Sequence, residues 1–512
     1  MVLMLLFKLN KMKKYTIHIW IILILFLTSC KDDLLINPSN QYTEETFWKT
    51  EIDALAGLSG CYNALYGTPN WFYETDMITS NGQAYNESNG TDAVARGAHT
   101  PITGLINDRW TSAYRGIGRA NILLNKIEEI TFTSNLKPRI IGEAKFLRAY
   151  YYHGLVDVFG GVPLILDIPN AETQSALPRD SKDKVIQQIL KDLDDAIAVL
   201  PNSYTATSDL GRVTKGAALA LKARVLLYNE QWGDAAATAK QLMDLKIYSL
   251  FPNYRELFLL ANERNSEVIF NIEYQSPGFV HNLDNNSYTL NRPAPTRNLA
   301  DVYLMKDGKT KETSSEYDPG KPFDNRDPRL LQTMYTVGYI FNGRLTTKAH
   351  VVTTGFGLKK YTDLTDNDAK EAPKRNNCEI NLILIRYAEV LLTYAEAQNE
   401  AVGPDQSVYD AIKTLRKRAS VNMPELSPNL NKDEMREEIR RERRVELAFE
   451  GIYYSDIKRW KTAEIENNGP MYNYLNQVIS TRVFNKDRDY LWPVPSNQIQ
   501  LNPNLTQNPN WF

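Results

Sequence analysis

The sequence holds many acidic side chains, but no spacing singles out a catalytic pair. Its 512 residues include 61 Asp and Glu, and glycoside hydrolysis needs two carboxylates at a set separation, which a sequence cannot identify among so many. Histidines occur at positions 18, 99, 153, 281 and 350, without an HExxH motif or a close His/Cys cluster. No GxSxG motif of a serine hydrolase occurs. The residues therefore predict no catalytic centre, no metal site and no cofactor.

Two further patterns suggest chemistry but are better explained by structure. Gly116-Ile117-Gly118 resembles part of a nucleotide fingerprint, yet it lies within an expected helix, where helix packing explains the glycines. An acid-rich turn that contains Asp363, Asp366 and Asp368 offers oxygen ligands for calcium, but it lacks the glycine of an EF-hand loop. We interpret it as a solvated turn.

Aromatic rings in aperiodic sequence are the stronger signal, and they indicate ligand binding. Aromatic residues make up 11% of the chain, with 29 Tyr and 8 Trp. Rings that no amphipathic stripe buries can stack on flat ligand faces, while nearby polar groups bond hydroxyls. The predicted ligand-binding residues are Trp71, Tyr73, Asp76, Asn81, Tyr85, Asn86 and Asp92 in the segment 68–107, and Tyr274, Phe279 and Tyr288 in a later segment. Any single ring can instead pin a loop to the scaffold.

The first 29 residues are typical of an export signal. Lys13-Lys14 precede an apolar run at 17–27 that is too short to span a membrane, and Thr28-Ser29-Cys30 follow it. Residues 27–30 also match a lipobox, in which Cys30 becomes the acylated first residue of a lipoprotein. We therefore predict a lipoprotein signal peptide at 1–29, lipidation at Cys30 and a lipidated tether at 30–49.

The charge distribution gives no basic face that would suit nucleic acid. The formal net charge is −2, and after residue 29 the chain carries 55 bases against 61 acids. The most basic run, REEIRRERR at 436–444, is interleaved with glutamates at helical spacing, which predicts ion pairs along and between helices. Beyond Cys30 the chain has only Cys61 and Cys378, and their spacing does not decide whether they pair.

Periodic apolar positions predict a mainly α fold that must position these residues. A helix that includes residues 140–158 has an apolar stripe and ends at Gly160-Gly161. Its three tyrosines at 150–152 surround it, so we expect other helices to cover it on several sides. Further helices are predicted at 50–67, from 110 onward, and at 181–200, 215–228, 232–243, 385–400 and 407–418. The hairpin at 215–243 looks like a tetratricopeptide unit.

A loop-rich segment interrupts this helical pattern. Glu267 to Ile272 is strand-like, and six prolines between 277 and 328 break any long helix. The predicted organisation is a tetratricopeptide-like helical scaffold at 50–249 with a binding loop at 68–107, an inserted ligand-binding lobe with short strands at 250–382, and a C-terminal helical scaffold and tail at 383–512.

Several stretches together resemble the SusD/RagB family. They are FWKTEIDALAGLSGCYNALYG, WTSAYRGIGRANILLNKI, EAKFLRAYYYHGLVDVFGGVPL, RVTKGAALALKARVLLY, NRDPRL, IRYAEVLLTYAEAQNE, IRRERRVELAFEGIYYSDIKRW and YLWPVPSNQI, in the family's order from the lipobox to near the C-terminus. The resemblance implies a cell-surface lipoprotein of the outer membrane, and Lys31-Asp32-Asp33 resembles its export tag. It also implies capture of a glycan or another nutrient for a SusC-like TonB-dependent transporter, on tetratricopeptide-like helix pairs that carry a variable binding lobe. No particular sugar follows from it.

Three alternatives to a glycan-binding protein remain open from the sequence. They are a surface glycoside hydrolase or lyase, a member of the same family that binds peptide, and a structural tetratricopeptide adaptor. Release of product from a candidate glycan would identify an enzyme. The aromatic loops argue against an adaptor, which would place its rings in helix grooves.

Overall fold

The computed structural model describes residues 47–67, 69–85 and 89–511, and the predicted signal peptide, Cys30 and most of the tether lie outside this described part. Thr50–Phe512 form one compact unit. It is mainly helical, and its described strands form small two-stranded sheets. Among the described residues, no helix combines the length and the apolar character that crossing a membrane requires.

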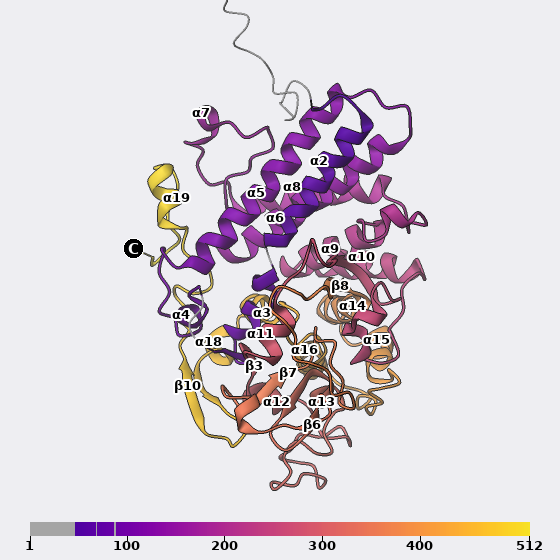
Figure 1. Cartoon of the computed structure of the whole chain (residues 1–512), viewed down its shortest axis with the longest axis vertical. Coiled ribbons are helices and arrows are strands. Elements are labelled where there is room, and N and C mark those ends of the chain that lie inside the picture. Colours follow the sequence, from indigo (N-terminus) through magenta and orange to yellow (C-terminus); the bar gives the residue numbers. More distant parts are fainter. Residues whose placement is uncertain (1–46, 68, 86–88, 512) are drawn as a thin grey trace, which may run out of the picture. The chain divides into compact units, whose positions relative to one another are not determined.

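A layer of long helices forms one end of this unit, where Figure 1 shows them side by side. A capping box between Thr50 and Asp53 begins the first of them. A Cβ atom added at Gly116 would lie 2.4 Å from the Tyr151 ring, so the glycine permits close helix packing, as predicted. The helices are α2 (Glu51–Asn63), α5 (Gly104–Lys126), α6 (Leu136–Phe159) and α8 (Lys182–Val199).

Helix α6 is the predicted central helix, and neighbours cover it on several sides. It packs against α2, α5 and α8. The hydroxyl groups of Tyr151 and Tyr152 donate hydrogen bonds of 2.8 Å to the carbonyl oxygens of Cys61 and Ile165. The helix ends at Gly160, whose φ of +73° lies in a region that favours glycine. The prediction of a covered core helix is therefore confirmed.

Helical hairpins continue the scaffold toward the other end of the unit. Consecutive helices pack as antiparallel neighbours, α9 on α10 and α14 on α15, while α10 also packs on α14 and α14 on α16. The tetratricopeptide-like scaffold predicted from the sequence is thus confirmed. The helices are α9 (Lys215–Tyr228), α10 (Trp232–Asp244), α14 (Tyr387–Val402), α15 (Gln406–Arg416) and α16 (Lys432–Glu446).

The predicted lobe with short strands is inserted between α10 and α14. It leaves and rejoins the scaffold through an antiparallel pair, β2 (Val268–Ile272) and β8 (Leu382–Arg386), in which Ile272 lies opposite Leu382. A small core of Tyr335, Phe341, Val351 and Leu364 holds the lobe together. Its elements are α11 (Leu283–Tyr288), β3 (Pro293–Pro295), α12 (Arg297–Ala300), α13 (Arg329–Thr333), β4 (Met334–Thr336), β5 (Ile340–Phe341), β6 (Arg344–Leu345) and β7 (Phe356–Leu358).

The segment 68–107 differs from the aperiodic loop that the sequence predicts. It contains α3 (Pro69–Met77), β1 (Gly82–Ala84) and α4 (Thr91–Ala95), and α5 already begins at Gly104. Phe72 and every residue from Glu74 to Gly82 are buried. Because neighbours enclose this stretch and many of its buried residues are polar, no amphipathic stripe marks the helix in the sequence. Strand β1 pairs with β3, which ties the segment to the lobe.

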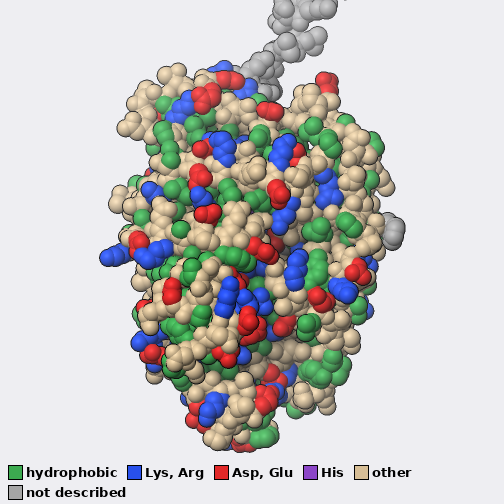
Figure 2. Space-filling view, turned by 180° about the vertical axis from the view of Figure 1, so that it is seen from behind, with side chains coloured by type: hydrophobic (Ala, Val, Ile, Leu, Met, Phe, Trp, Pro, Cys, Tyr) green, Lys and Arg blue, Asp and Glu red, His purple; other side chains and the backbone are tan. Residues whose placement is uncertain are grey.

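Buried ion pairs join α16 to the lobe and to the β2–β8 pair. Glu446 contacts Arg386, Arg418 and Arg329, and Glu450 contacts Arg386 and Lys360. Within the charged run at 436–444, Glu442 pairs with Arg329 at 2.6 Å and Arg443 with Asp456 at 2.7 Å, which confirms the prediction that the run is structural. On the surface, Figure 2 shows positive and negative side chains interspersed over one face of the molecule.

The C-terminal region closes back on the long helices. It comprises α17 (Tyr453–Arg459), α18 (Ala463–Glu466), the antiparallel pair β9 (Gly469–Tyr472) and β10 (Val478–Arg482), and α19 (Ser496–Leu501). Trp492 is buried against Phe159 at the end of α6. Cys61 and Cys378 are both free, buried thiols.

Candidate functional site

A groove of about 270 Å³ lies between α2, the short helix η2 (Ala64–Gly67) and the outer end of β2. Its volume is near the lower end of the range for small-molecule sites. The lining mixes aromatic rings with amide, hydroxyl and charged groups. It consists of Ser59, Tyr62, Asn63, Leu65, Tyr66, Ser208, Leu210, Gly211, Arg212, Asn271, Ile272, Glu273 and Phe279.

Two stacked rings form the aromatic wall of the groove. Phe279 is 51% exposed, and its ring lies 5.0 Å from that of Tyr66 with an interplanar angle of 21°. Tyr274 is buried behind them and meets Tyr66 edge-on at 5.1 Å. The Tyr66 hydroxyl donates to the carbonyl oxygen of Glu273 at 2.5 Å, which fixes the ring's orientation. The structure therefore brings two predicted rings, Tyr274 and Phe279, to this groove, one as support and one as an exposed face.

The Glu273 carboxylate forms a polar wall of the groove, in contact with the loop 208–212. It accepts hydrogen bonds from Arg264 at 2.5 Å, Asn271 at 2.9 Å and Asn381 at 3.3 Å. Gly211 packs directly on it: a Cβ atom there would lie 2.6 Å from the carboxylate, and φ is +86°. The close contact and the positive φ both favour glycine at this position.

The floor of the groove is an ordered polar network. The Tyr62 hydroxyl donates to Glu143 at 2.6 Å and accepts from the Val213 N–H at 2.9 Å. Glu143 in turn pairs with Arg139 at 3.3 Å and Arg212 at 3.4 Å. Burial and the negative charge of Glu143 raise the pKa of Tyr62 well above its usual value, so the phenol stays protonated. The floor is thus fixed before any ligand enters.

This arrangement is suited to binding a sugar. Ring faces can stack on the C–H faces of a sugar, while carboxylate, amide and guanidinium groups bond its hydroxyls.

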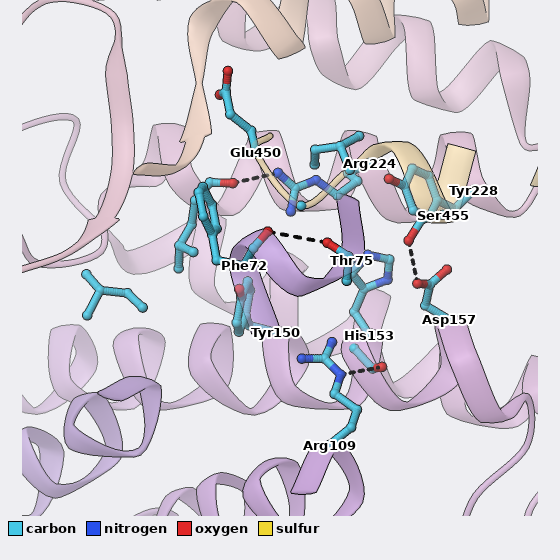
Figure 3. Close-up of a pocket in the computed structure, with 15 residues that line it drawn as sticks. Phe72, Thr75, Arg109, Tyr150, His153, Asp157, Arg224, Tyr228, Glu450 and Ser455 are labelled. Atoms are coloured by element: carbon cyan, nitrogen blue, oxygen red, sulfur yellow. Dashed lines mark hydrogen bonds between the residues drawn. The ribbon is translucent and has the colours of Figure 1, made fainter. Parts of the chain in front are cut away.

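A second cavity, shown in Figure 3, is enclosed by α3, α6, α9 and α17 and holds about 70 Å³. Ser455 donates to the Asp157 carboxylate at 2.6 Å, and Arg109 donates to the Gly154 carbonyl at 3.3 Å. Burial lowers the pKa of His153 to about 4, so its ring is neutral at pH 7. The cavity has room for ordered water but is far smaller than a typical ligand site.

Several predicted binding residues lie elsewhere, and two of them have a structural role instead. Asp76 and Asn81 are fully buried. The Asp76 carboxylate accepts a hydrogen bond from the Asn81 amide at 3.0 Å. It also accepts hydrogen bonds from the backbone N–H of Phe449 at 3.1 Å and of Gly451 at 3.0 Å. The assignment of these two side chains as hydroxyl partners is corrected, because their polar atoms already bond within the protein.

The remaining predicted residues do not gather at the groove. Tyr288 is partly buried and packs on the small core of the lobe, 5.8 Å from the Phe341 ring. Asp92 pairs with Arg96 at 2.5 Å, and Tyr85 follows β1 with 39% of its surface exposed. Trp71 and Tyr73 lie in α3, but their side chains, like the whole of Asn86, are outside the described part of the chain.

Sequence reasoning missed Asn63, Tyr66, Arg212 and Glu273. They come from α2, η2, the loop before α9 and the end of β2, so no local spacing links them. Of these four residues, only Tyr66 could have been found from local sequence. It precedes Gly67 at the end of a predicted helix, where a ring is less covered by its own helix.

Two family models match this chain. One, described as the SusD family, matches residues 258–511. The other, described as starch-binding and associating with the outer membrane, matches residues 39–227. Together they cover both the long helices and the lobe with the C-terminal hairpins.

Individual proteins match over nearly their whole length. SusD-like protein P38 of Formosa agariphila is 26% identical, covering 98% of this chain and 99% of the relative, and SusD-like protein P2 of the same organism is 27% identical, covering 97% and 99%. A crystal structure of a SusD-like carbohydrate-binding protein from Bacteroides fragilis aligns with a TM-score of 0.84 and 28% identity, covering 90% of this chain and all of the other.

Proposed function

Because this chain belongs to the SusD family, we propose that it binds an oligosaccharide in the groove between α2 and β2. The observation that carries this proposal is the exposed stack of Phe279 on Tyr66 beside the Glu273 carboxylate. The structural relative from Bacteroides fragilis, described as carbohydrate-binding, supports a sugar as the ligand. We further propose delivery of the bound sugar to a SusC-like TonB-dependent transporter at the cell surface, which rests on the family resemblance.

The geometry favours a sugar segment with a free C–H face. Phe279 stacks on Tyr66 and is half exposed, so its outer side offers a flat apolar face. Glu273 and Asn63 line the same groove as hydrogen-bonding partners. Sugar rings have this combination of an apolar face and hydroxyl edges. The groove volume of about 270 Å³ admits a short segment rather than a whole polysaccharide, so a longer glycan would continue over the surface.

Phe279→Ala is expected to weaken binding of the cognate oligosaccharide by about 1–3 kcal/mol, by analogy with aromatic stacking on flat ligands. The ring is half exposed, so its loss should leave the melting temperature nearly unchanged. Tyr66→Ala should weaken binding similarly. The measurement is calorimetry with an oligosaccharide selected by a glycan-array screen, and the same samples are assayed for product release.

Leu345→Ala provides a matched control, because it removes a similarly exposed apolar side chain from the lobe outside the groove. It should bind as the wild type does. Wild-type affinity in both Phe279→Ala and Tyr66→Ala would refute the proposal that this groove binds the oligosaccharide. A loss of affinity that occurs only in Trp71→Ala and Tyr85→Ala would instead indicate a binding site on the segment 68–107.

Cys30→Ser is expected to release the protein from the membrane fraction, because the proposed anchor is the lipid on this residue. The described residues contain no helix that could replace that anchor. Fractionation of cells that produce the wild type and the variant at equal levels measures the effect. Unchanged membrane association of Cys30→Ser would contradict lipid anchoring.

A further inference from the structure

A crevice lined by lysines lies at the start of α8, apart from the groove. It has an inner chamber of about 150 Å³ and an open mouth of about 400 Å³. The two adjoin each other, because they share part of their lining. The shared residues are Lys182, Ile186, Tyr228, Asn229 and Glu230. We call the whole feature the lysine crevice.

Four cations line the inner chamber, and three of them lack a carboxylate partner. Arg459 is paired with Glu396 at 2.6 Å and with Asp456 at 2.9 Å. Within the described part of the chain, no ion pair includes Lys182, Lys458 or Lys461. The Lys461 ammonium lies 4.5 Å from the centre of the Tyr490 ring, at the rim of the chamber.

Lys458 is the central feature of the lysine crevice because its charge is buried. Only 5% of the residue is exposed. Its ammonium donates one hydrogen bond, to the Asp157 carbonyl oxygen at 2.8 Å, and lies 5.1 Å from the centre of the Tyr454 ring. An ammonium has three donors, so two remain for another acceptor. Burial lowers the pKa of Lys458 to about 8, which still leaves most of it charged at pH 7.

Three acids also line the lysine crevice: Asp157 in the inner chamber, Asp183 at the mouth and Glu230 in both. Among the described residues, none of the three forms an ion pair within 4.0 Å of Lys182, Lys458 or Lys461. Glu230 is exposed at the mouth.

The Asp157 carboxylate accepts a hydrogen bond from Ser455. It also lines the separate cavity of Figure 3, together with His153 and Arg109. Arg459 is already paired with Glu396 and Asp456. Burial alone would raise the pKa of Asp157, but the nearby Lys458 ammonium and other groups lower it, so Asp157 compensates part of the buried charge.

We propose that the lysine crevice binds a tetrahedral oxyanion, sulfate or phosphate, either free or as an ester group on a sugar. A buried ammonium is costly unless an anion or acceptor meets it, and such an oxyanion offers several acceptors to the unused donors of Lys458, with Lys182 and Lys461 at the sides. The chamber is large enough for a small ion. The open mouth leaves room for a sugar that carries the ion as an ester.

The test is calorimetric titration with sodium sulfate, against sodium chloride at equal ionic strength, and then with glucose 6-sulfate. The wild type should bind sulfate specifically. Lys182→Gln and Lys458→Gln should each weaken binding about tenfold or more, because each removes a charge-assisted contact. A sugar ester that binds more tightly than free sulfate identifies the ester as the source of the anion, and equal or weaker binding identifies the free ion.

Lys184→Gln is the matched control. It lies in the same first turn of α8, is exposed and pairs with Asp180, and does not line the crevice. It should change sulfate affinity by less than about twofold. Lys182 is exposed, so its variant should fold even where Lys458→Gln does not. The absence of sulfate-specific heat in the wild type, or equal affinity in Lys182→Gln and Lys184→Gln, would refute the proposal.

Discussion

Glu446→Gln is expected to lower the free energy of unfolding by about 3–5 kcal/mol, a large share of the stability of an ordinary protein. Glu446 is fully buried at the end of α16. Its carboxylate lies 2.7 Å from Arg386, 2.7 Å from Arg418 and 2.8 Å from Arg329. The substitution keeps the shape of the side chain but leaves three buried guanidinium groups with less negative charge, which is costly in a low-dielectric interior.

The effect of Glu446 on stability depends on pH in a definite direction. Burial alone would raise the pKa of Glu446, but Arg418, Arg386 and Arg329 outweigh it and hold the pKa well below its usual range. A carboxyl whose folded-state pKa is depressed stabilises the fold above its unfolded pKa and loses that contribution as pH falls through the folded value. The difference between wild type and Glu446→Gln should therefore be full at pH 7 and shrink below about pH 4.

Urea unfolding followed by circular dichroism at pH 7 measures the effect. Glu437→Gln is the control on the same helix, because Glu437 is 68% exposed and lies 3.7 Å from Arg440. It should change stability by less than about 1 kcal/mol. If both variants unfolded at the same urea concentration, the buried ion pairs would not stabilise the fold as proposed.

Trp492→Ala is expected to cost about 3–5 kcal/mol of folding stability. The Trp492 side chain has no exposed surface, and its ring packs on that of Phe159. Its indole N–H donates to the Tyr454 hydroxyl at 2.8 Å. Truncation leaves a cavity beside the end of α6, which loses the free energy of burying the ring. It also removes the hydrogen-bond donor to the buried Tyr454 hydroxyl, so the two losses of stability add.

Trp492→Phe separates these contributions, since it keeps most of the apolar volume and loses the indole N–H. Its loss of stability should be clearly smaller than that of Trp492→Ala. Thermal unfolding monitored by circular dichroism is suitable for both variants. An unchanged melting temperature for Trp492→Ala would mean that the C-terminal segment does not contribute to the core formed with α6.

The sequence predicts the scaffold well where one side of a helix is apolar and the other polar. Helix α8 shows this pattern at Ile186, Ile189 and Leu193, which are all buried. Helix α3 could not be predicted in the same way, because neighbours enclose it and Thr75 and Asp76 are as buried as Phe72. Its polar groups bond to segments nearly four hundred residues away, such as Phe449 and Gly451, which no local pattern can reveal.

The candidate site was predicted less well than the scaffold, and its rings explain why. Tyr274 and Tyr288 lie in Asn- and Pro-rich sequence without periodicity, yet tertiary contacts bury Tyr274 and pack Tyr288 on the lobe core. Phe279, in the same kind of sequence, stacks on Tyr66 at a distant helix end and yet keeps half of its surface exposed. The difference arises from contacts between remote segments, so aperiodic sequence alone does not separate supporting rings from exposed ones.

The antiparallel pairing of β2 with β8 has a consequence for how the lobe can vary in length. Because Ile272 lies opposite Leu382, the chain leaves the scaffold and returns to it at neighbouring positions. The scaffold therefore has to span the same short gap whatever number of residues the insertion contains. The entropy of closing such a loop rises only slowly with its length. Insertions, deletions or an exchanged lobe between these two strands should leave the register of the helical hairpins unchanged, which makes this junction a natural place to graft a different recognition surface onto the scaffold.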